Sequence, residues 1–492
     1  MGKNTHKLAI CKQHSTTRVK SAALLPPSMP ESAARSVGGT EYSWCRSVPS
    51  GTGITVLGLL LSKSPDVSLL QTALRSLQNS HPILRSRLRL DASTNTFHFI
   101  TPRDPHIQIT PFDLQYTSRI IGSESNDRPS SPFLRILEYE LNRNSWRDHS
   151  GSMSADTDVF HASLYTVSDQ QWAVFLRLHT SACDRTAAVA LLKELPERVG
   201  GRVKEGKGTE MELERKGKVR LAIEDLIPEG KANKPFWTRG LDVLGYSLNS
   251  FRFSNLNFVD AHSPRSSKVA KMQLDRDETE RLIVGCKSRG IKLCGALAAA
   301  AMIASWASKQ RPDFEKEKYA VVTLTDCRSI LDPILNGNDL GFYHSAILNT
   351  HDVGGETLWE LARRSYMAFE NAKNCNKHFT DMSDLNYLMC KAIDSPGLTP
   401  SSSLRTALVS VFEDPVIQDS ESDKMHQEVG LEDYEGCSSV HGVGPSIAIF
   451  DTIRNGMLNC TCVYPSPLHS REQVLKLLDH MKKILVDAGH IN

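Results

Sequence analysis

The segment from Gln171 to Leu192, QWAVFLRLHTSACDRTAAVALL, is the feature that most constrains the fold. It begins with the apolar content of a strand, turns through a small polar patch and continues as an apolar helix. A strand that feeds directly into a helix is the basic unit of mixed α and β architectures. His179, Thr180 and Asp184 stand at the turn, so this segment also holds the first candidates for a functional site.

Strand and helix patterns alternate irregularly along the rest of the chain. The residue patterns predict helices over 67–79, 275–289, 293–309, 357–373 and 470–488, and strands over 83–90, 269–274, 319–324, 407–412, 446–450 and 457–464. The fold class is therefore α/β or α+β. Residues 413–435 carry nine acidic side chains and read as a solvated surface loop.

The length of the chain indicates more than one structural unit, since 492 residues exceed the usual size of a single core. We expect a disordered leader over residues 1–38, a first unit over 39–225, a linker with a short helix over 226–264, and a second unit over 265–492. The leader is basic, with no acidic residue before Glu31, and an organellar transit peptide is the alternative for it.

The composition excludes several classes of function. A net charge of +2 gives no reason to expect nucleic acid or a membrane surface as a partner. No run of residues reaches the roughly 20 apolar positions that a membrane span needs. The eleven cysteines are scattered without a CxxC pair, which argues against a disulfide framework or a metal site and favours a cytoplasmic location.

Three motifs together resemble the chloramphenicol-acetyltransferase-like superfamily, which includes condensation domains and alcohol acetyltransferases. His81 to Arg85, HPILR, follows an amphipathic helix as the family's "HPxLR" element does. The segment HTSACDR, from His179 to Arg185, is similar to the family's HHxxxDG motif in a degenerate form. The segments 325–328 and 340–343 resemble the strand that ends in an arginine and the later "lGxF" element of the second lobe.

The resemblance implies two similar lobes in a V with an inter-lobe tunnel. An acyl-CoA or similar thioester would enter this tunnel as a co-substrate and pass its acyl group to an alcohol or amine acceptor. The resemblance implies no tightly bound cofactor and no metal, and we expect a monomer.

Residue by residue, the resemblance assigns roles to five positions. Asp184 matches the aspartate that holds the motif in shape, and Arg328 is its expected salt-bridge partner. His81 and Arg85 match structural positions of the "HPxLR" element. Thr180 stands where the family has its catalytic histidine, and a threonine hydroxyl has no useful basicity at neutral pH. General-base catalysis contributes typically ~10²–10⁴-fold, so this replacement is a large departure.

Two other histidines are candidates for the missing base. Successive side chains of a strand point to opposite faces, so His179 should face away from Thr180 and into the first lobe unless a bulge turns it. His344 belongs to the second lobe near the expected tunnel, with a half-buried strand histidine as the alternative. Cys183 has no nearby base in the sequence and is better explained by packing.

Two hypotheses of different class follow from these residues. The chain is either an acyltransferase with a non-standard active site, or a catalytically inactive relative that binds a ligand or a partner. A cavity lined by Thr180 and open to substrate favours the first, and a cavity filled by side chains favours the second.

Overall fold

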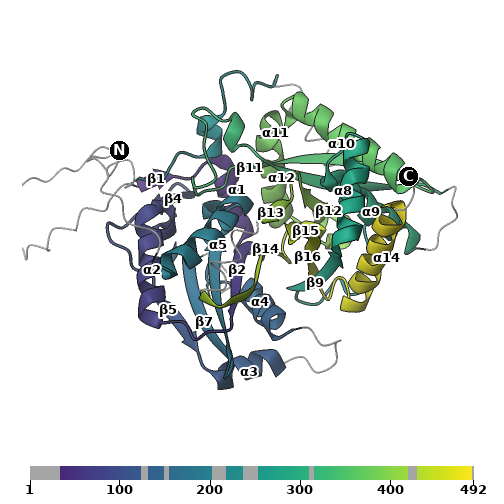
Figure 1. Cartoon of the computed structure of the whole chain (residues 1–492). Coiled ribbons are helices and arrows are strands. Elements are labelled where there is room, and N and C mark those ends of the chain that lie inside the picture. The colour runs from purple at the N-terminus through teal and green to yellow at the C-terminus, as the bar shows by residue number, and fades with distance from the viewer. Residues whose placement is uncertain are drawn as a thin grey trace, which may run out of the picture.

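Two lobes lie side by side in the computed structural model, each built around one large β-sheet (Figure 1). The structure describes residues 34–122, 131–148, 154–201, 218–235, 253–309, 315–418 and 429–489. Residues 1–33 of the expected leader and residues 236–252 of the expected linker lie outside this range. The predicted α/β class with two lobes is confirmed.

The sheet of the first lobe has five strands in the order β14-β2-β8-β7-β5. Their bounds are Leu431–Val440, Thr52–Leu61, Gln171–His179, Phe160–Ser168 and Ile109–Phe112. A smaller sheet beside it has the order β1-β4-β3-β6, with bounds Ala34–Ser36, Thr96–Ile100, Arg87–Asp91 and Asp156–Asp158.

Helices cover both faces of the five-stranded sheet. They are α1 (Gly39–Ser47), α2 (Val67–Ser80), α3 (Leu114–Gly122), α4 (Pro132–Asn142) and α5 (Arg185–Val199). Alternate residues of β8 serve the two faces, as the period of a strand requires. Leu176 and Leu178 pack in the cluster that holds α2 and α5, and Phe175 packs in the cluster that holds α4.

The second lobe contains a seven-stranded sheet in the order β11-β10-β12-β15-β16-β9, with β13 paired to β15. The bounds in that order are His344–Val353, Glu317–Asp326, Arg405–Phe412, Gly444–Arg454, Met457–Ser466 and Ser266–Leu274, with β13 at Val416–Gln418. Its helices are α8 (Arg276–Ser288), α9 (Leu293–Ala307), α10 (Leu358–Asn374), α11 (Lys377–Thr380), α12 (Met382–Asp394) and α14 (Arg471–Gly489).

The core of this lobe lies between its sheet and the helices α9, α10 and α14. Helix α9 is rich in alanine and almost wholly buried, because small side chains let neighbouring helices approach it closely. Capping boxes start α8 at Asp275 and α10 at Thr357. Among the described residues no single helix has the length and composition of a membrane span, although the bent pair α8 and α9 does when the two are taken together.

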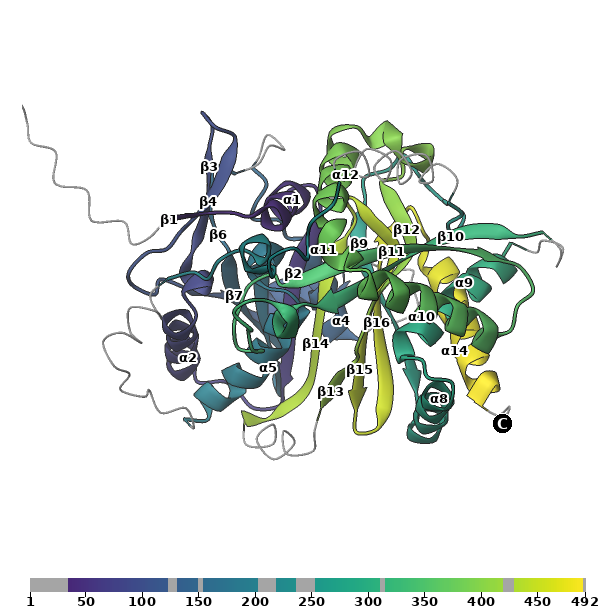
Figure 2. The ribbon, with the colours of Figure 1, turned by 90° about the horizontal axis from the view of Figure 1, so that it is seen from above.

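Strand β14 joins the two lobes. It belongs to the chain segment of the second lobe, yet it pairs antiparallel with β2 at the edge of the first lobe's sheet. Figure 2 shows β14 running next to β2, between the first lobe's sheet and the strands β15 and β16 of the second lobe. The sheet of the first lobe therefore includes a strand from the chain segment 265–492.

Three other local predictions need correction. Residues 34–36 fall in the expected disordered leader but pair with β4 as β1. The predicted strand over 83–90 begins as a 3-10 turn at Pro82–Arg85, and the strand itself starts at Arg87. The acidic segment 413–435 is not only a solvated loop, since β13 and the start of β14 lie in it.

Candidate active site

The strand–turn–helix of the sequence is present as β8, a 3-10 turn at Thr180–Ala182, and α5. Asp184 is the N-cap of α5, where its Oδ1 accepts a hydrogen bond of 2.9 Å from the backbone N–H of Ala187. A carboxylate at this position satisfies a free N–H group and complements the helix dipole. The turn between strand and helix is therefore held by the same aspartate that the motif resemblance singles out.

Asp184 and Arg328 form a buried bidentate pair across the two lobes. Oδ2 of Asp184 lies 2.9 Å from Nη1 of Arg328, and Oδ1 accepts a hydrogen bond of 3.0 Å from Nη2. Oδ2 also accepts the backbone N–H of Tyr343 at 2.8 Å. Burial alone would raise the pKa of Asp184, but Arg328 and His344 hold it below its usual range. The predicted salt bridge is confirmed.

Thr180 is the start of a chain of hydroxyl groups. Its Oγ1 donates a hydrogen bond of 2.6 Å to the carbonyl of Gly53 and lies 2.8 Å from Oγ1 of Thr55, which lies 2.9 Å from Oγ of Ser438. Each hydroxyl has one proton. Because Thr180 donates its proton to the carbonyl of Gly53, the hydroxyl of Thr55 donates to Thr180 and the hydroxyl of Ser438 donates to Thr55. These oxygens can accept further hydrogen bonds, but none of them is a base.

His179 faces into the first lobe, as the strand alternation predicts. Its side chain is 1% exposed, its Nδ1 accepts the backbone N–H of Ser181 at 3.2 Å, and its ring meets Trp146 edge-on at 5.3 Å. Burial lowers the pKa of His179 to about 3, so the imidazole is neutral. No bulge turns it toward Thr180, which leaves it in a packing position.

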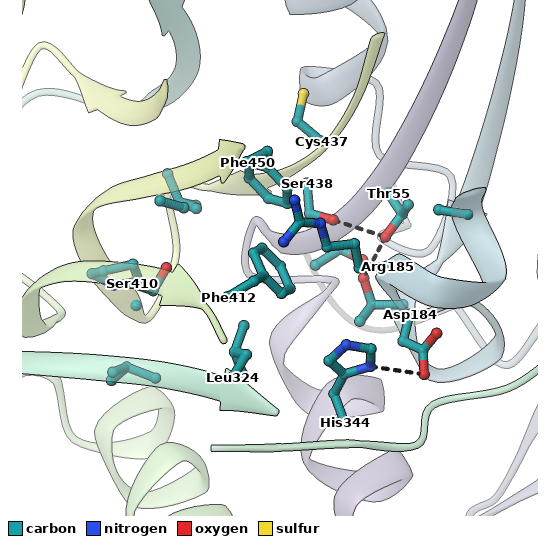
Figure 3. A pocket seen from close by; sticks show the side chains of 18 of the residues that line it. Thr55, Asp184, Arg185, Leu324, His344, Ser410, Phe412, Cys437, Ser438 and Phe450 are labelled. Carbon is teal, nitrogen blue, oxygen red and sulfur yellow. Dashed lines mark hydrogen bonds and ion pairs between the residues drawn. The ribbon is translucent and has the colours of Figure 1, made fainter. Parts of the chain in front are cut away.

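A cavity of about 790 Å³ lies between the lobes. The first lobe contributes Trp44, Thr55, Thr180, Cys183, Asp184 and Arg185, and the second contributes Leu324, His344, Ser410, Phe412 and Phe450 among others. Strand β14 adds Cys437 and Ser438 (Figure 3). This volume falls in the range typical of sites for small molecules, and a few polar groups stand in a largely apolar lining.

His344 is the imidazole in the wall of this cavity. It is the first residue of β11 and is 5% exposed, and its Nδ1 lies 3.1 Å from Oδ2 of Asp184. Its ring meets that of Phe412 edge-on at 6.0 Å. Figure 3 shows the other ring nitrogen directed away from Asp184, on the cavity side. The contact is at ion-pair distance and is not an aligned hydrogen bond, since Nδ1 has no hydrogen-bond partner among the described residues. In a neutral ring with its proton on Nδ1, beside the carboxylate, the lone pair is on Nε2.

Arg185 stands where the resembled motif has glycine, and its side chain crosses to the second lobe. Nη2 lies 3.0 Å from Oδ1 of Asp451, and Nη1 donates to the carbonyl of Asp414 at 3.1 Å. The guanidinium also lies 4.1 Å from the ring centroid of Phe412. The side chain is 9% exposed and forms part of the cavity wall.

The "HPxLR" residues lie apart from the residues that line this cavity. His81 is 2.7 Å from Glu194 of α5 through its Nε2, and Arg85 donates to the carbonyls of Pro102 and Gln78. These contacts tie α2, the 3-10 turn and α5 together. Cys183 is fully buried, and burial raises the pKa of its thiol well above the ordinary value, so it is not an activated nucleophile.

Sequence reasoning missed Thr55, Ser438 and Phe412 as parts of the site. Thr55 lies in β2, whose run GITVLGLLL is a signal for a buried strand. Phe412 ends a strand that the pattern did predict. No local signal points to Ser438, because β14 reaches the cavity only through its pairing with β2.

Comparison with known proteins rests on structure, because no family model and no curated protein sequence matches the chain. The TRI3 trichothecene 15-O-acetyltransferase from Fusarium sporotrichioides is similar with a TM-score of 0.68 and 12% identity, over 95% of this chain and 100% of that one. The EpoB cyclization-docking bidomain from Sorangium cellulosum gives 0.64 and 14%, over 94% and 86%.

The condensation domain of the Monacolin K polyketide synthase MokA gives a TM-score of 0.57 and 11% identity, over 93% of this chain and 98% of that one. These identities are too low to transfer an activity, and they establish the arrangement of the elements. The chain has the two-lobed fold of the chloramphenicol-acetyltransferase-like superfamily, the fold that condensation domains and the TRI3 acetyltransferase share.

Proposed function

We propose that this protein is an acyltransferase that moves an acyl group from a coenzyme A-type thioester to a hydroxyl or amine acceptor, with His344 as the general base. The observation that carries the proposal is the contact between Asp184 and His344 in the cavity wall. It places a carboxylate on one side of an imidazole and open cavity on the other, which is the arrangement that a histidine base requires.

The proton transfer follows from this geometry. The carboxylate of Asp184 holds the proton of His344 on Nδ1, so Nε2 accepts the proton of a bound acceptor. The acceptor oxygen or nitrogen then attacks the thioester carbonyl, the carbon–sulfur bond breaks, and the imidazolium returns the proton to the departing thiolate. Asp184 stays ionised throughout, because Arg328 and His344 hold its pKa below the usual range against the effect of burial.

In this proposal Thr180 does not act as a base. Its proton is committed to Gly53, and its oxygen already accepts from Thr55. The remaining lone pair of Thr180 can accept a hydrogen bond from an acceptor hydroxyl or amine, which makes it a group that orients substrate. The general base has in effect moved from the first lobe, where the superfamily motif has it, to the second.

The proposal of a coenzyme A-type thioester as the acyl donor is based on the fold alone. Three cations in the cavity lining are paired with carboxylates: Arg185 with Asp451, Lys271 with Glu435, and Arg454 with Asp433 at 2.8 Å. A donor with a phosphorylated carrier would therefore need the other cations of the lining, such as Lys193 and Lys391, for its phosphates. A panel of thioesters with and without coenzyme A distinguishes these cases.

The second candidate is a catalytically inactive protein that binds a ligand in the same cavity. It is favoured by the threonine at position 180, which removes the base from the position that the family motif gives it. The cavity itself is compatible with both functions, so only turnover separates them.

The test is an assay of the full chain with acyl-CoA and acyl-N-acetylcysteamine thioesters of increasing length, and with generic alcohol and amine acceptors. Release of free thiol is the signal. We expect release that depends on the acceptor as well as on the protein. A folded protein that releases no thiol above the rate without protein, with every donor and acceptor, contradicts the proposal and supports the binding function.

A further inference from the structure

The side chain of Arg185 crosses the inter-lobe cavity. It starts from the N-terminus of α5 in the first lobe, and the groups it contacts belong to the second lobe: the carboxylate of Asp451, the carbonyl of Asp414 and the ring of Phe412. Few side chains could make an ionic contact and a stacking contact at once. The planar guanidinium of arginine is suited to both.

The aromatic contacts place the side chain of Arg185 between two parts of the cavity. The ring of Phe412 meets His344 edge-on at 6.0 Å and lies 5.4 Å from the ring of Phe450. Arg185 stacks against the same Phe412 ring. In Figure 3, Arg185 and Phe412 lie between His344 and the part of the cavity lined by Phe450 and Cys437.

Moving the side chain of Arg185 away from Asp451 is energetically unfavourable. Asp451 is 1% exposed, and its Oδ2 has no hydrogen-bond partner among the described residues. Arg185 is the cation paired with Oδ1 of this carboxylate. If Arg185 swung away, a buried carboxylate would lose this partner, which is strongly unfavourable. The guanidinium is therefore a fixed part of the wall.

We propose that Arg185 determines the length of the group that binds beside His344. Together with Phe412 it forms a barrier, and a chain that starts at His344 ends there instead of continuing toward Phe450. The wild-type protein accordingly selects short acyl groups or compact acceptors. This inference rests on the proposed function in that it takes His344 as the reacting end, but the barrier can be measured by binding alone.

The chain offers a matched control in Arg454. It too lines the cavity, pairs with an aspartate at 2.8 Å and lies over an aromatic ring, that of Tyr434, at 5.0 Å. Its side chain is 29% exposed, against 9% for Arg185, so it stands at the edge of the cavity and not across it. Removal of Arg454 takes away the same chemistry without opening the barrier.

The experiment measures binding of unreactive thioethers, S-ethyl, S-hexyl and S-decyl N-acetylcysteamine, by titration calorimetry. The proteins are the wild type, Arg185→Ala, Arg185→Met and Arg454→Ala, each in the full chain. Methionine fills part of the space of arginine but cannot pair with Asp451, so Arg185→Met should open the barrier only in part. The double variant Arg185→Ala with Asp451→Asn avoids a stranded carboxylate and serves if Arg185→Ala does not fold.

We expect the S-decyl probe to bind Arg185→Ala, or the double variant, about tenfold more tightly than the wild type, because further methylene groups become buried. The S-ethyl probe should bind all proteins alike. Arg185→Met should fall between the wild type and Arg185→Ala, and Arg454→Ala should behave as the wild type does. Equal affinity of the S-decyl probe for the wild type and the opened variant overturns the proposal, as does failure of the probe to bind either. Because no turnover is needed, this result is independent of whether acyl transfer occurs.

Discussion

Nδ1 of His344 lies 3.1 Å from Oδ2 of Asp184, although the two residues come from different lobes. The same carboxylate oxygen accepts the backbone N–H of Tyr343 and lies 2.9 Å from Arg328. One aspartate thus caps a helix, closes the contact between the lobes and orients the imidazole in the cavity wall. Its substitution should affect stability and chemistry together.

Asp184→Asn should lower the free energy of unfolding by about 3 kcal/mol, because the buried guanidinium of Arg328 would lose its buried charged partner. Urea unfolding of the purified variant measures the change. Asp326→Asn is the control, since Asp326 also lies 3.0 Å from Arg328 but is 36% exposed. Its cost should stay below about 1 kcal/mol. Equal costs for the two variants would mean that the buried pair does not hold the lobes together.

The stability of the fold should decrease in mild acid because several histidines are buried in the neutral form. Burial lowers the pKa of His179 and of His469 to about 3, from an ordinary value of 6.5. The unfolded chain takes up these protons as the pH falls below 6.5, whereas the folded protein does so only near pH 3. Their stabilising effect is therefore complete above pH 6.5 and is lost progressively below it.

The expected loss is about 1.4 kcal/mol for each histidine and each pH unit inside that window. Urea midpoints at neutral pH and at acidic pH measure it, and His179→Gln should have a smaller pH dependence than the wild type. A midpoint that is the same across the window would contradict the buried neutral histidines.

The strand–turn–helix around Asp184 could be predicted because the residue patterns that form it are adjacent in the sequence. The apolar run of β8, the polar turn and the apolar start of α5 follow each other in sequence. The bridge from Asp184 to Arg328 was predicted only through the motif resemblance, since nothing local pairs the two. The terminal helix α14 and the strands β15 and β16 also followed from their own periodicity.

The rest of the site depends on how distant segments meet. The pairing of β14 with β2 is a long-range contact, and the sequence LEDYEGCSSV is too polar to indicate a strand at a sheet edge between lobes. The hydroxyl chain from Ser438 to Thr180 follows from that pairing. In the same way, the contact of His344 with Asp184 needs both lobes in place, so His344 could be named from the sequence only as a candidate.

Thr180→Ala should cost about 1–2 kcal/mol of stability, because the carbonyl of Gly53 loses its hydroxyl donor. Turnover should fall modestly, by less than about tenfold, since Thr180 orients the acceptor but is not the base. Thr180→His should not raise turnover with a generic alcohol acceptor, because His344 already supplies the general base and the larger imidazole takes space beside the acceptor. Thiol release by the three proteins at equal concentration measures this. A large loss of turnover in Thr180→Ala would show that the hydroxyl has a catalytic role.

The most direct test of the proposed mechanism is the turnover of His344→Gln beside that of His351→Gln. Both histidines lie on β11 and both are 5% exposed, but His351 is not among the residues that line the cavity. With the best donor and acceptor from the thioester panel, His344→Gln should lose about 10²-fold or more in kcat, while His351→Gln should keep the wild-type value. Equal turnover of His344→Gln and His351→Gln, from folded proteins, would contradict His344 as the general base.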